Sequence, residues 1–482
     1  MLRQFACLTM AIMLAPAAPC LGAEQRPPNI VLILADDLGW ADLGCYGADL
    51  HQTPHLDRLA AAGVRFTDAY AGSSVCTPTR AALMTGRHPA RLGMTIWAEA
   101  AEEPPKPERL IPPVAEHNLP WSETTIAEHL QAAGYQTALV GKWHLGDARH
   151  YPETHGFDVN IGGTLWGAPQ TFFYPYSGRG MYGQEFRYVP HLEFGQPGEY
   201  LTDRLTDEAL KVIDRCGDRP FFLYLSHHAP HTPIEAKAAD VAQFERRLKP
   251  GLHHQNAPYA AMIKSLDESV GRIREHLAER GLAERTLIIF SSDNGGFVGK
   301  DRGRGVPVTS NWPLRSGKGA LYEGGIRVPL VVSWPGVTPA GRECREPVVT
   351  MDLFSTLLAA AGRQSPDNVP LDGVSLLPVL KDPETKLDRE ALYFHYPHYY
   401  HTTSPVSSIR MGDLKLVEFY EDDRTELYNL HDDLGESHDL AGSQPQAAAQ
   451  LKERLHAWRD AVGARLPTAN PNFKPHAPKP RG

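Results

Sequence analysis

The chain has 482 residues, 42% hydrophobic and 22% charged, a composition typical of soluble globular proteins. Its length allows one large domain with a smaller companion, or two to three domains of average size. The formal net charge of -9 is mild for this length and argues against nucleic-acid binding. An anionic substrate would therefore have to be attracted by a local positive site, because the field of the whole protein is negative.

The N-terminal segment has the pattern of an export signal. Arg3 supplies a positive start, residues 5–18 are almost entirely apolar, and Leu21-Gly22-Ala23 offers a cleavage site of small residues. The apolar run is shorter than the about 20 residues that a membrane-spanning helix needs. We expect residues 1–23 to be a signal peptide and the mature protein to be periplasmic or secreted, with no transmembrane segment. Pro19 disfavours a lipid anchor at Cys20.

Buried strands alternating with helices are expected over most of the chain. Short apolar runs predict strands at residues 30–35, 136–140, 220–226, 286–291 and 328–334. Helical spacing that ends in glycine predicts helices at residues 56–63, 126–134 and 259–281. This alternation indicates an α/β domain over residues 24–380, with a large, mostly parallel sheet flanked by helices.

The hydrophobic pattern of the sequence changes after residue 380. Short alternating segments near residues 392–394, 408–411, 414–420 and 426–430 precede a helical segment at residues 444–462. They predict a smaller C-terminal subdomain with an antiparallel sheet over residues 381–465. Residues 466–482 are rich in proline and are expected to form a flexible tail. The six cysteines contain no Cys-x-x-Cys pair, so neither a zinc site nor a disulfide framework is indicated.

Polar residues follow four of the expected strands. They are Asp36-Asp37, Lys142 with His144, the segment 227–231, and Asp293-Asn294. One such group is often a helix cap, but four together indicate a ligand site, because ligands of open α/β sheets bind at the carboxyl ends of the strands. Oxygen ligands alone suit a hard cation, calcium before magnesium, and argue against zinc.

The segment Cys76-Thr77-Pro78-Thr79-Arg80 indicates which reaction this site carries out. It resembles the signature of type I sulfatases, in the alkaline phosphatase superfamily, and the resemblance extends over residues 29–440. Further matching motifs follow in the expected order: Ala35-Asp36-Asp37-Leu38-Gly39, Gly141-Lys142-Trp143-His144-Leu145-Gly146, Ala229-Pro230-His231-Thr232-Pro233, Ser292-Asp293-Asn294-Gly295, Gly317-Lys318-Gly319, Tyr322-Glu323-Gly324-Gly325 and Arg327-Val328-Pro329.

The resemblance implies a calcium-dependent sulfuric ester hydrolase with an alkaline phosphatase-like fold. Cys76 would be oxidised to formylglycine by a formylglycine-generating enzyme, and the hydrated aldehyde would attack sulfur. Arg80 would steady that group, and His144 would assist its proton movement. Lys142 and Lys318 would hold the sulfate oxygens. One calcium ion would be bound by a set that includes residue 76: Asp36, Asp37, Cys76, Asp293 and Asn294.

His231 is expected to be the general acid for the departing alcohol, with His227 as a minor alternative. A sugar alcohol is a poorer leaving group than a phenol, so the presence of a general acid favours sulfated carbohydrates as substrates. A finer expectation is exo-action on galactose or N-acetylgalactosamine sulfate units. The residues expected to set specificity are Trp97, Trp166, Trp312, His395, His398 and His401. Family members often carry a small polar donor after a His-Gly-Phe-Asp segment; here the segment ends at Asp158 and no equivalent donor is visible.

Three alternatives remain open from the sequence. The first is an arylsulfatase that acts on aryl substrates. The second is a phosphomonoester or phosphonate hydrolase of the same superfamily, whose members share the metal carboxylates. The third, disfavoured by the complete set of nucleophile and acid positions, is a binder of sulfated glycans in which Cys76 is never oxidised.

Overall fold

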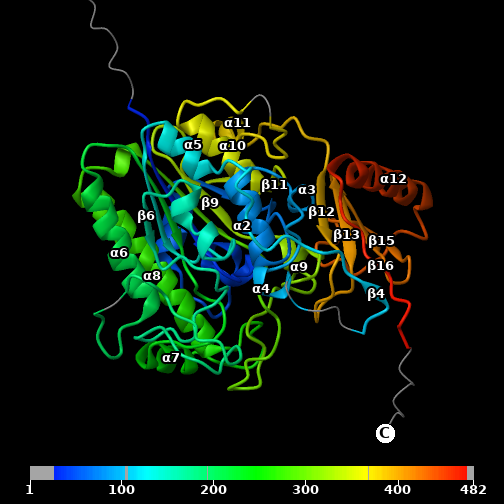
Figure 1. Cartoon of the computed structure of the whole chain (residues 1–482), viewed down its shortest axis with the longest axis horizontal. Helices are drawn as coiled ribbons and strands as arrows, with labels where there is room; N and C mark the ends of the chain where they lie inside the picture. The colour runs from blue at the N-terminus through cyan, green and yellow to red at the C-terminus, as the bar shows by residue number, and fades with distance from the viewer. Residues whose placement is uncertain (1–25, 102, 104–106, 193, 367–368, 475–482) are drawn as a thin grey trace, which may run out of the picture.

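A computed structural model of the chain describes residues 26–101, 103, 107–192, 194–366 and 369–474 (Figure 1). The expected signal peptide, with Cys7 and Cys20, lies outside the described residues. Within those ranges, no helix is both long enough and apolar enough to cross a bilayer. The cysteines of the described part are free thiols: Cys45, Cys76, Cys216 and Cys344.

An eight-stranded sheet forms the centre of the molecule. Its strand order is β10-β2-β9-β8-β1-β7-β5-β6. The strands are β1 (Asn29–Ala35), β2 (Val64–Phe66), β5 (Gln136–Gly141), β6 (Val159–Ile161), β7 (Phe221–Ser226), β8 (Thr286–Ser292), β9 (Leu330–Ser333) and β10 (Arg342–Cys344). Neighbouring strands run parallel except where β9 pairs with β8 and β2. The predicted mostly parallel sheet is therefore confirmed.

Helices cover both faces of this sheet (Figure 1). Alternate residues of β1 point to opposite sides, so Val31 and Ile33 pack with one helix layer and Leu32 and Leu34 with the other. The first layer consists of α1 (Pro54–Ala61), α6 (Leu201–Cys216) and α8 (Ala257–Glu279), with α7 (Ala238–Glu245) packed on α8. The second consists of α2 (Cys76–Thr85), α5 (Ile126–Ala132), α10 (Met351–Ala360) and α11 (Leu377–Lys381).

Shorter elements connect these layers. The helical turns are η1 (Trp40–Asp42), η2 (Gly44–Tyr46), α3 (Pro89–Leu92), α4 (Ala98–Ala101), η3 (Ala148–His150), η4 (Pro152–His155), η5 (Ala283–Arg285) and α9 (Glu323–Ile326). Two short pairings join β3 (Ala69–Tyr70) to β11 (Val348–Val349) and β4 (Leu110–Ile111) to β16 (Thr468–Ala469). The second pairing places part of the expected tail, residues 468–469, against the N-terminal half of the chain.

The C-terminal part forms a separate four-stranded antiparallel sheet, as predicted. Its strands, in order, are β12 (Leu392–Tyr396), β13 (Val406–Met411), β14 (Leu414–Phe419) and β15 (Thr425–Asn429). Helix α12 (Pro445–Val462) covers one face, where Leu451 and Leu455 lie in one hydrophobic cluster with Leu416. The opposite face packs against the large domain, where Phe394 lies in one cluster with Leu321.

Lys415, on β14 of the small sheet, contacts α9 of the large domain through a buried charge cluster. Its Nζ donates to Glu323 Oε1 and lies 2.8 Å from Glu436 Oε1, and all three side chains are fully buried. Burial, together with the charge of Glu323, raises the pKa of Glu436 to about 7 despite the opposing Lys415. The lysine is therefore the cation that faces Glu436, and it shares Glu323 with Arg327, whose Nη1 lies 3.1 Å from Glu323 Oε2.

We expect Lys415→Met to lower the free energy of unfolding by about 3–5 kcal/mol, because it leaves the buried Glu436 without a counter-charge and removes one of the cations that face Glu323. Urea denaturation followed by circular dichroism measures this loss. Adding Glu436→Gln to that variant should restore part of the stability. Lys386→Met, which removes an exposed lysine 3.0 Å from Glu346, is the matched control and should cost at most about 1 kcal/mol. A Lys415→Met protein as stable as the parent would show that the cluster is not a stabilising contact.

Candidate active site

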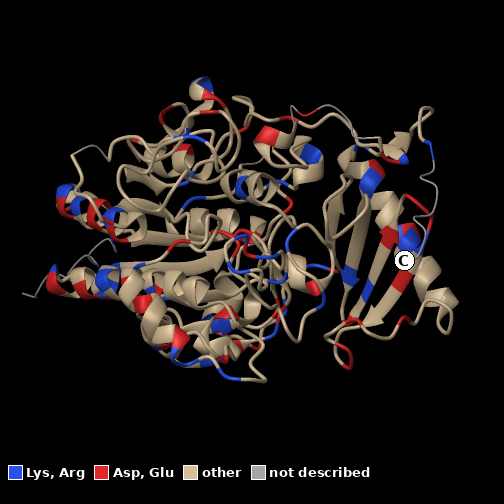
Figure 2. Cartoon of the chain, turned by 90° about the horizontal axis from the view of Figure 1, so that it is seen from below, with Lys and Arg blue, Asp and Glu red and all other residues tan. Residues whose placement is uncertain are grey.

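The carboxyl ends of four neighbouring strands, β8, β1, β7 and β5, supply most of the site. The polar groups predicted to follow these strands lie together in the interior, where acidic and basic segments crowd in Figure 2. Asp36 and Asp37 follow β1, Lys142 and His144 follow β5, His231 follows β7, and Asp293 and Asn294 follow β8. Cys76 and Lys318 reach the same place from α2 and from the loop before α9.

Glycine allows β5 and β7 to approach closely at this edge. Gly141 has φ +107°, and a Cβ there would lie 1.9 Å from the carbonyl oxygen of Ser226. The next residue, Lys142, then donates its backbone N–H to that same oxygen over 2.7 Å. Asp37 and His144 also have positive φ, at 65° and 60°. Such strained backbone is a common feature of functional sites.

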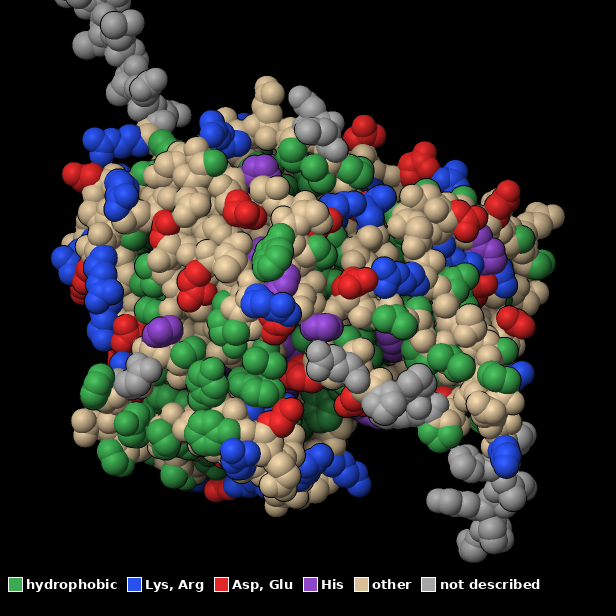
Figure 3. Space-filling view, viewed as in Figure 1, with side chains coloured by type: hydrophobic (Ala, Val, Ile, Leu, Met, Phe, Trp, Pro, Cys, Tyr) green, Lys and Arg blue, Asp and Glu red, His purple; other side chains and the backbone are tan. Residues whose placement is uncertain are grey.

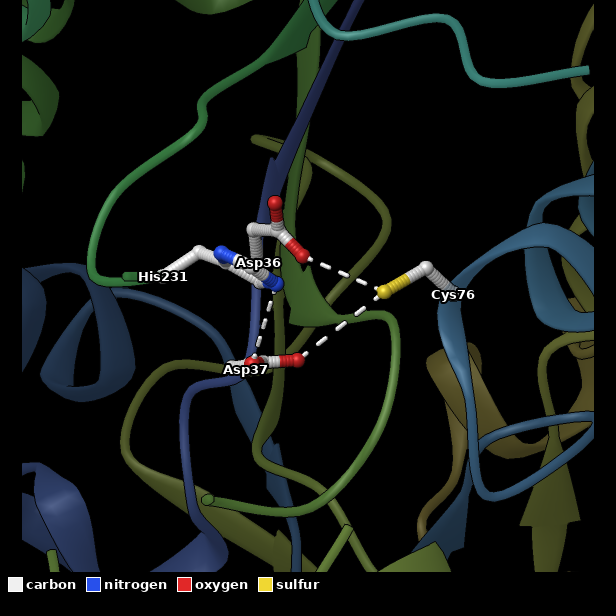
Figure 4. A group of neighbouring side chains, drawn as sticks. All are labelled: Asp36, Asp37, Cys76 and His231. Carbon is white, nitrogen blue, oxygen red and sulfur yellow. Dashed lines mark hydrogen bonds and ion pairs between the residues drawn. The ribbon is translucent and has the colours of Figure 1, made fainter. Parts of the chain in front are cut away.

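Cys76 is the first residue of α2 and is buried. Its Sγ lies 3.5 Å from Asp36 Oδ1 and 3.9 Å from Asp37 Oδ1, and Figure 4 shows Cys76 and His231 approaching these aspartates from opposite sides. Burial, followed by the charge of Asp293, raises the pKa of the thiol well above its ordinary value. An unmodified Cys76 is therefore a neutral thiol, which is a weak nucleophile.

Each carboxylate of the site has one nearest cation, and Asp36 also lies 3.9 Å from Arg80. The pairs are Lys142 with Asp36 (2.8 Å), Lys318 with Asp37 (2.7 Å) and Arg80 with Asp293 (2.8 Å). Arg80 also donates to Ser226 Oγ over 2.6 Å. Its guanidinium thus holds Asp293 and the end of β7 in place. Three negative and three positive side chains leave the unmodified site close to electroneutral.

The oxygen atoms in this cluster fit a hard divalent cation. Asn294 Oδ1 is buried without a hydrogen-bond partner among the described residues, although Asn294 Nδ2 donates to Asp37 Oδ1 over 2.8 Å. Together with the carboxylates of Asp36, Asp37 and Asp293, this unpartnered oxygen forms an all-oxygen donor set of the kind that binds calcium. Adding a divalent cation to an otherwise balanced cluster would leave a local positive excess. That excess is the local attraction for an anion that the overall charge of -9 requires.

His231 faces the same centre from the β7 side. Its Nδ1 lies 2.7 Å from the carbonyl oxygen of Thr232, so this nitrogen carries the proton and Nε2 is the free acceptor. Nε2 lies 3.2 Å from Lys318 Nζ and 3.4 Å from Asp37 Oδ2. Burial, opposed by Asp37 but supported by Lys318, lowers the pKa of His231 to about 4. The predicted acid therefore lies beside the predicted sulfate-binding lysine.

His144 has a partner that the sequence analysis missed. Its Nε2 lies 2.6 Å from Glu99 Oε2, and the other oxygen of Glu99 accepts the backbone N–H of Gly167 over 2.9 Å. The ring therefore donates from Nε2, while Nδ1 is buried without a hydrogen-bond partner among the described residues. Burial lowers the pKa of His144, although Glu99 opposes this. Glu99 lies in the short helix α4, outside every motif, so no sequence signal marks it.

These residues border a cavity of about 580 Å³. In the space-filling view, histidine and charged side chains of both signs gather near the middle of one face of the molecule (Figure 3). Asp37, Cys76, His144, His231 and Lys318 line the cavity. It is also lined by Tyr400, which precedes the predicted specificity residue His401, and by residues that carried no signal in the sequence, among them Tyr182, Arg187, Phe297 and Arg302.

Three of the residues expected to set specificity lie at or near this cavity. Trp97 lines it directly. Trp166 packs behind it, with the Arg187 guanidinium carbon 4.9 Å from its ring centroid. His401 contacts two lining residues, its ring centroid being 5.3 Å from Phe297 and 4.4 Å from Tyr400. The structure thus places these three side chains where a substrate ring could contact them or their neighbours.

The other three lie elsewhere. Trp312 is exposed and stacks on His253, with ring centroids 4.0 Å apart. His395 is buried and lies within hydrogen-bonding distance of Ser407 Oγ and the carbonyl oxygen of Arg465. His398 contacts Thr95 and lines a different cavity. His395 therefore packs within the small sheet, and His398 packs against the large domain away from the active-site cavity.

Comparisons with known proteins agree with this geometry. A family model described as Sulfatase matches residues 28–363, and one described as N-sulphoglucosamine sulphohydrolase, C-terminal, matches residues 316–461. Arylsulfatase A of Homo sapiens is 36% identical over 490 residues, covering 91% of this chain and 90% of that protein. N-acetylgalactosamine-6-sulfatase of Canis lupus familiaris is 35% identical over 400 residues, covering 80% of this chain and 72% of that protein.

Solved structures give the same result. The crystal structure of Ps i-CgsB in complex with k-i-k-neocarrahexaose superposes with a TM-score of 0.74 at 33% identity, covering 90% of this chain and 93% of that one. The phosphonate monoester hydrolase of Agrobacterium radiobacter superposes with a TM-score of 0.63 at 21% identity, covering 92% of this chain and 97% of that one. At that identity the second likeness concerns the fold alone.

Proposed function

This chain belongs to the sulfatase family and is a sulfuric ester hydrolase of alkaline phosphatase-like fold, and we propose that it removes sulfate from sulfated carbohydrates by means of a formylglycine made from Cys76. The observation that carries the proposal is the position of Cys76 at the start of α2, among three carboxylates and three cations. Oxidation requires a formylglycine-generating enzyme in the producing cell. Burial raises the pKa of the unmodified thiol, so the proposed nucleophile is the hydrated aldehyde and not the thiol.

We propose that Asp36, Asp37, Asp293 and Asn294 hold one calcium ion together with residue 76. The bound ion would supply positive charge that polarises the sulfate group. The buried, unpartnered Asn294 Oδ1 and the surrounding carboxylates support this donor set. Arg80 fixes Asp293 in place through two contacts, at 2.9 Å from Nε and 2.8 Å from Nη2. Its role in this proposal is to position the metal ligands beneath residue 76.

Lys142 and Lys318 are the proposed binding groups for the sulfate oxygens. Lys318 Nζ lies 3.5 Å from Cys76 Sγ, and it also contacts His231. A sulfate bound against Lys318 therefore comes within reach of His231, which we propose donates the proton to the leaving sugar oxygen. Both lysines are fixed by their aspartates, so their charges are oriented before the substrate arrives.

Glu99 is the proposed positioning residue for His144. By accepting the Nε2 proton it leaves the Nδ1 lone pair to take a proton from residue 76. We expect Glu99→Gln to lower kcat by about 10- to 100-fold with little change in KM, and to move the acidic limb of the pH profile to lower pH, because the carboxylate charge that raises the pKa of His144 is lost. Steady-state kinetics across pH measure both effects.

Glu116→Gln removes an exposed carboxylate paired with Arg465 and is the matched control for that experiment. It should leave the kinetics and the pH profile unchanged. A Glu99→Gln enzyme whose kcat falls while its pH profile stays fixed would show that Glu99 supports the fold of α4 rather than the protonation state of His144.

The finer substrate class is also a proposal. One relative is named N-acetylgalactosamine-6-sulfatase, and one solved relative is in complex with k-i-k-neocarrahexaose. These names, with Trp97 and Tyr182 in the cavity wall, support galactose or N-acetylgalactosamine sulfate units as the proposed substrate, and exo-action on them is part of the same proposal. Sulfate release from a panel of defined sulfated monosaccharides, measured beside nitrophenyl sulfate and nitrophenyl phosphate, tests this. Faster turnover of the phosphate would favour the phosphatase alternative, and turnover of the aryl sulfate alone would favour an arylsulfatase.

A further inference from the structure

A second cluster of metal-ligating side chains lies outside the catalytic centre. It consists of Asp42 in η1, His51 in the loop before α1, and His254 just before α8. All three side chains are buried. None of them belongs to the motifs that identify the sulfatase site, and no step of the proposed mechanism uses them.

The distances within this cluster match those between ligands of one small cation. His254 Nε2 lies 3.3 Å from Asp42 Oδ1, and His51 Nδ1 lies 3.6 Å from the same oxygen. Ligand atoms on all three residues lie within 4.8 Å of one another. Around a tetrahedral zinc ion with bonds of about 2.0–2.1 Å, neighbouring ligand atoms are about 3.4 Å apart. The cluster therefore needs only small side-chain movements to close around such an ion.

In its neutral form, His254 directs a lone pair into the cluster. His254 Nδ1 lies 2.7 Å from Asp49 Oδ1, so the ring donates its proton to that carboxylate. Its Nε2 is buried, lies 3.3 Å from Asp42 Oδ1 and has no well-aligned hydrogen-bond partner among the described residues. Against burial, Asp42 and Asp49 raise the pKa of His254, so a cation would have to displace the Nε2 proton. A histidine that donates one ring nitrogen to a carboxylate while the other stays free is the usual arrangement of a metal ligand.

The carboxylate of Asp42 is equally well oriented. Its Oδ2 accepts from the Tyr259 hydroxyl and from the backbone N–H of Gly39, both at 2.7 Å, and its Oδ1 accepts from Thr309 Oγ1 at 2.6 Å. These donors fix the direction of Oδ1 toward the two histidines. Outer contacts of this kind orient ligating carboxylates in known metal sites.

We propose that Asp42, His51 and His254 bind a divalent cation of the zinc class, through Asp42 Oδ1, His51 Nδ1 and His254 Nε2. Two imidazole nitrogens with one carboxylate suit zinc rather than calcium, so this site would differ in kind from the oxygen cluster around Asp36. Burial lowers the pKa of His51 to about 4, which keeps that ring neutral and able to ligate at neutral pH. His51 Nδ1 also lies 2.9 Å from the carbonyl oxygen of Asp42 and donates to it, so cation binding requires the other tautomer of His51, with the proton on Nε2, and replaces this hydrogen bond.

The site has a route to solvent and a link to the catalytic loop. His51 lines a surface cavity of about 460 Å³, together with Gln52 and Lys264. On the inner side, the Tyr259 hydroxyl that contacts Asp42 lies 3.2 Å from the carbonyl oxygen of Asp37. A cation bound here would therefore brace the segment between Asp37 and Asp42, directly after β1, without touching the substrate.

Metal binding by the full-length protein tests the proposal. After chelation and dialysis, the protein is saturated with calcium to fill the oxygen cluster and then titrated with zinc chloride or cobalt chloride. We expect one equivalent of zinc by elemental analysis, and a visible absorption band of tetrahedral cobalt. His51→Gln and His254→Gln should each weaken zinc binding at least about 10-fold and abolish the cobalt band.

His253→Gln is the matched control, because His253 is the exposed neighbour of His254 and lies outside the cluster. It should bind zinc as the parent protein does. Absence of the zinc equivalent or the cobalt band in the parent protein would overturn the proposal, whether or not the variants fold. Unchanged binding in the folded His51 and His254 variants would also overturn it. In either case His254 would be explained as a charged ring that bridges Asp42 and Asp49. The result is independent of sulfatase activity.

Discussion

Cys76→Ala is expected to abolish sulfate release, with kcat/KM falling on the order of 10⁴- to 10⁶-fold, the loss seen when a covalent nucleophile is removed. Alanine has no sulfur to oxidise, so no aldehyde can form at position 76. The variant keeps the fold, because the side chain that it loses is a small one at the first position of α2. Sulfate release from a sulfated monosaccharide, with circular dichroism to check the fold, measures the effect.

Cys216→Ala is the matched control for this experiment. Cys216 is also a buried free thiol, but it lies at the end of α6, and its Sγ contacts the carbonyl oxygen of Val212. This variant should retain full activity. If Cys76→Ala kept a turnover clearly above a small residual activity, residue 76 would not be the nucleophile. A direct attack by water at the metal cluster would then have to replace it.

His231→Ala is expected to lower kcat/KM for a sugar sulfate by about 10²- to 10⁴-fold, and to affect an activated aryl sulfate far less. A sugar oxygen needs a proton as the ester bond breaks, whereas a nitrophenolate can leave without one. Parallel kinetics on the two substrates measure the difference. His227→Ala should show no such difference, because His227 is buried against Ser269, with Nε2 3.0 Å from that hydroxyl oxygen. Equal losses on both substrates in His231→Ala would assign the proton to another group.

The same residue predicts the direction of the pH dependence. Burial lowers the pKa of His231 to about 4; the negative charge of Asp37 opposes this shift and the positive charge of Lys318 adds to it. The protonated fraction of His231 therefore falls as the pH rises above that value. For sugar sulfates, kcat/KM reports groups of the free enzyme and should therefore decrease with rising pH, approaching about tenfold per pH unit. In His231→Ala this slope should disappear.

The strand ends of the site could be predicted from the sequence because the signal is local. An apolar run that stops at Asp36-Asp37 or Asp293-Asn294 shows both the strand and the group that follows it. Strands β8, β1, β7 and β5 are neighbours, so their ends meet without any further information. The antiparallel direction of β9 could not be predicted, because an apolar run has the same pattern in either direction.

Contacts between distant segments could not be predicted in this way. Glu99 reaches His144 from a four-residue helix with no periodicity. Asp42 meets His254 across more than 200 residues of chain. Trp312 was expected near the substrate from its place before Lys318, yet it stacks outward on His253. In each case the partner is chosen by tertiary packing, which motif and composition do not encode.

The measurement that tests the central claim most directly is the mass of the peptide containing position 76, taken from active enzyme. The mechanism predicts the mass of an aldehyde in place of the CH₂–SH group, in proportion to the active fraction of the protein. A fully active preparation in which Cys76 carries an unmodified thiol would contradict it.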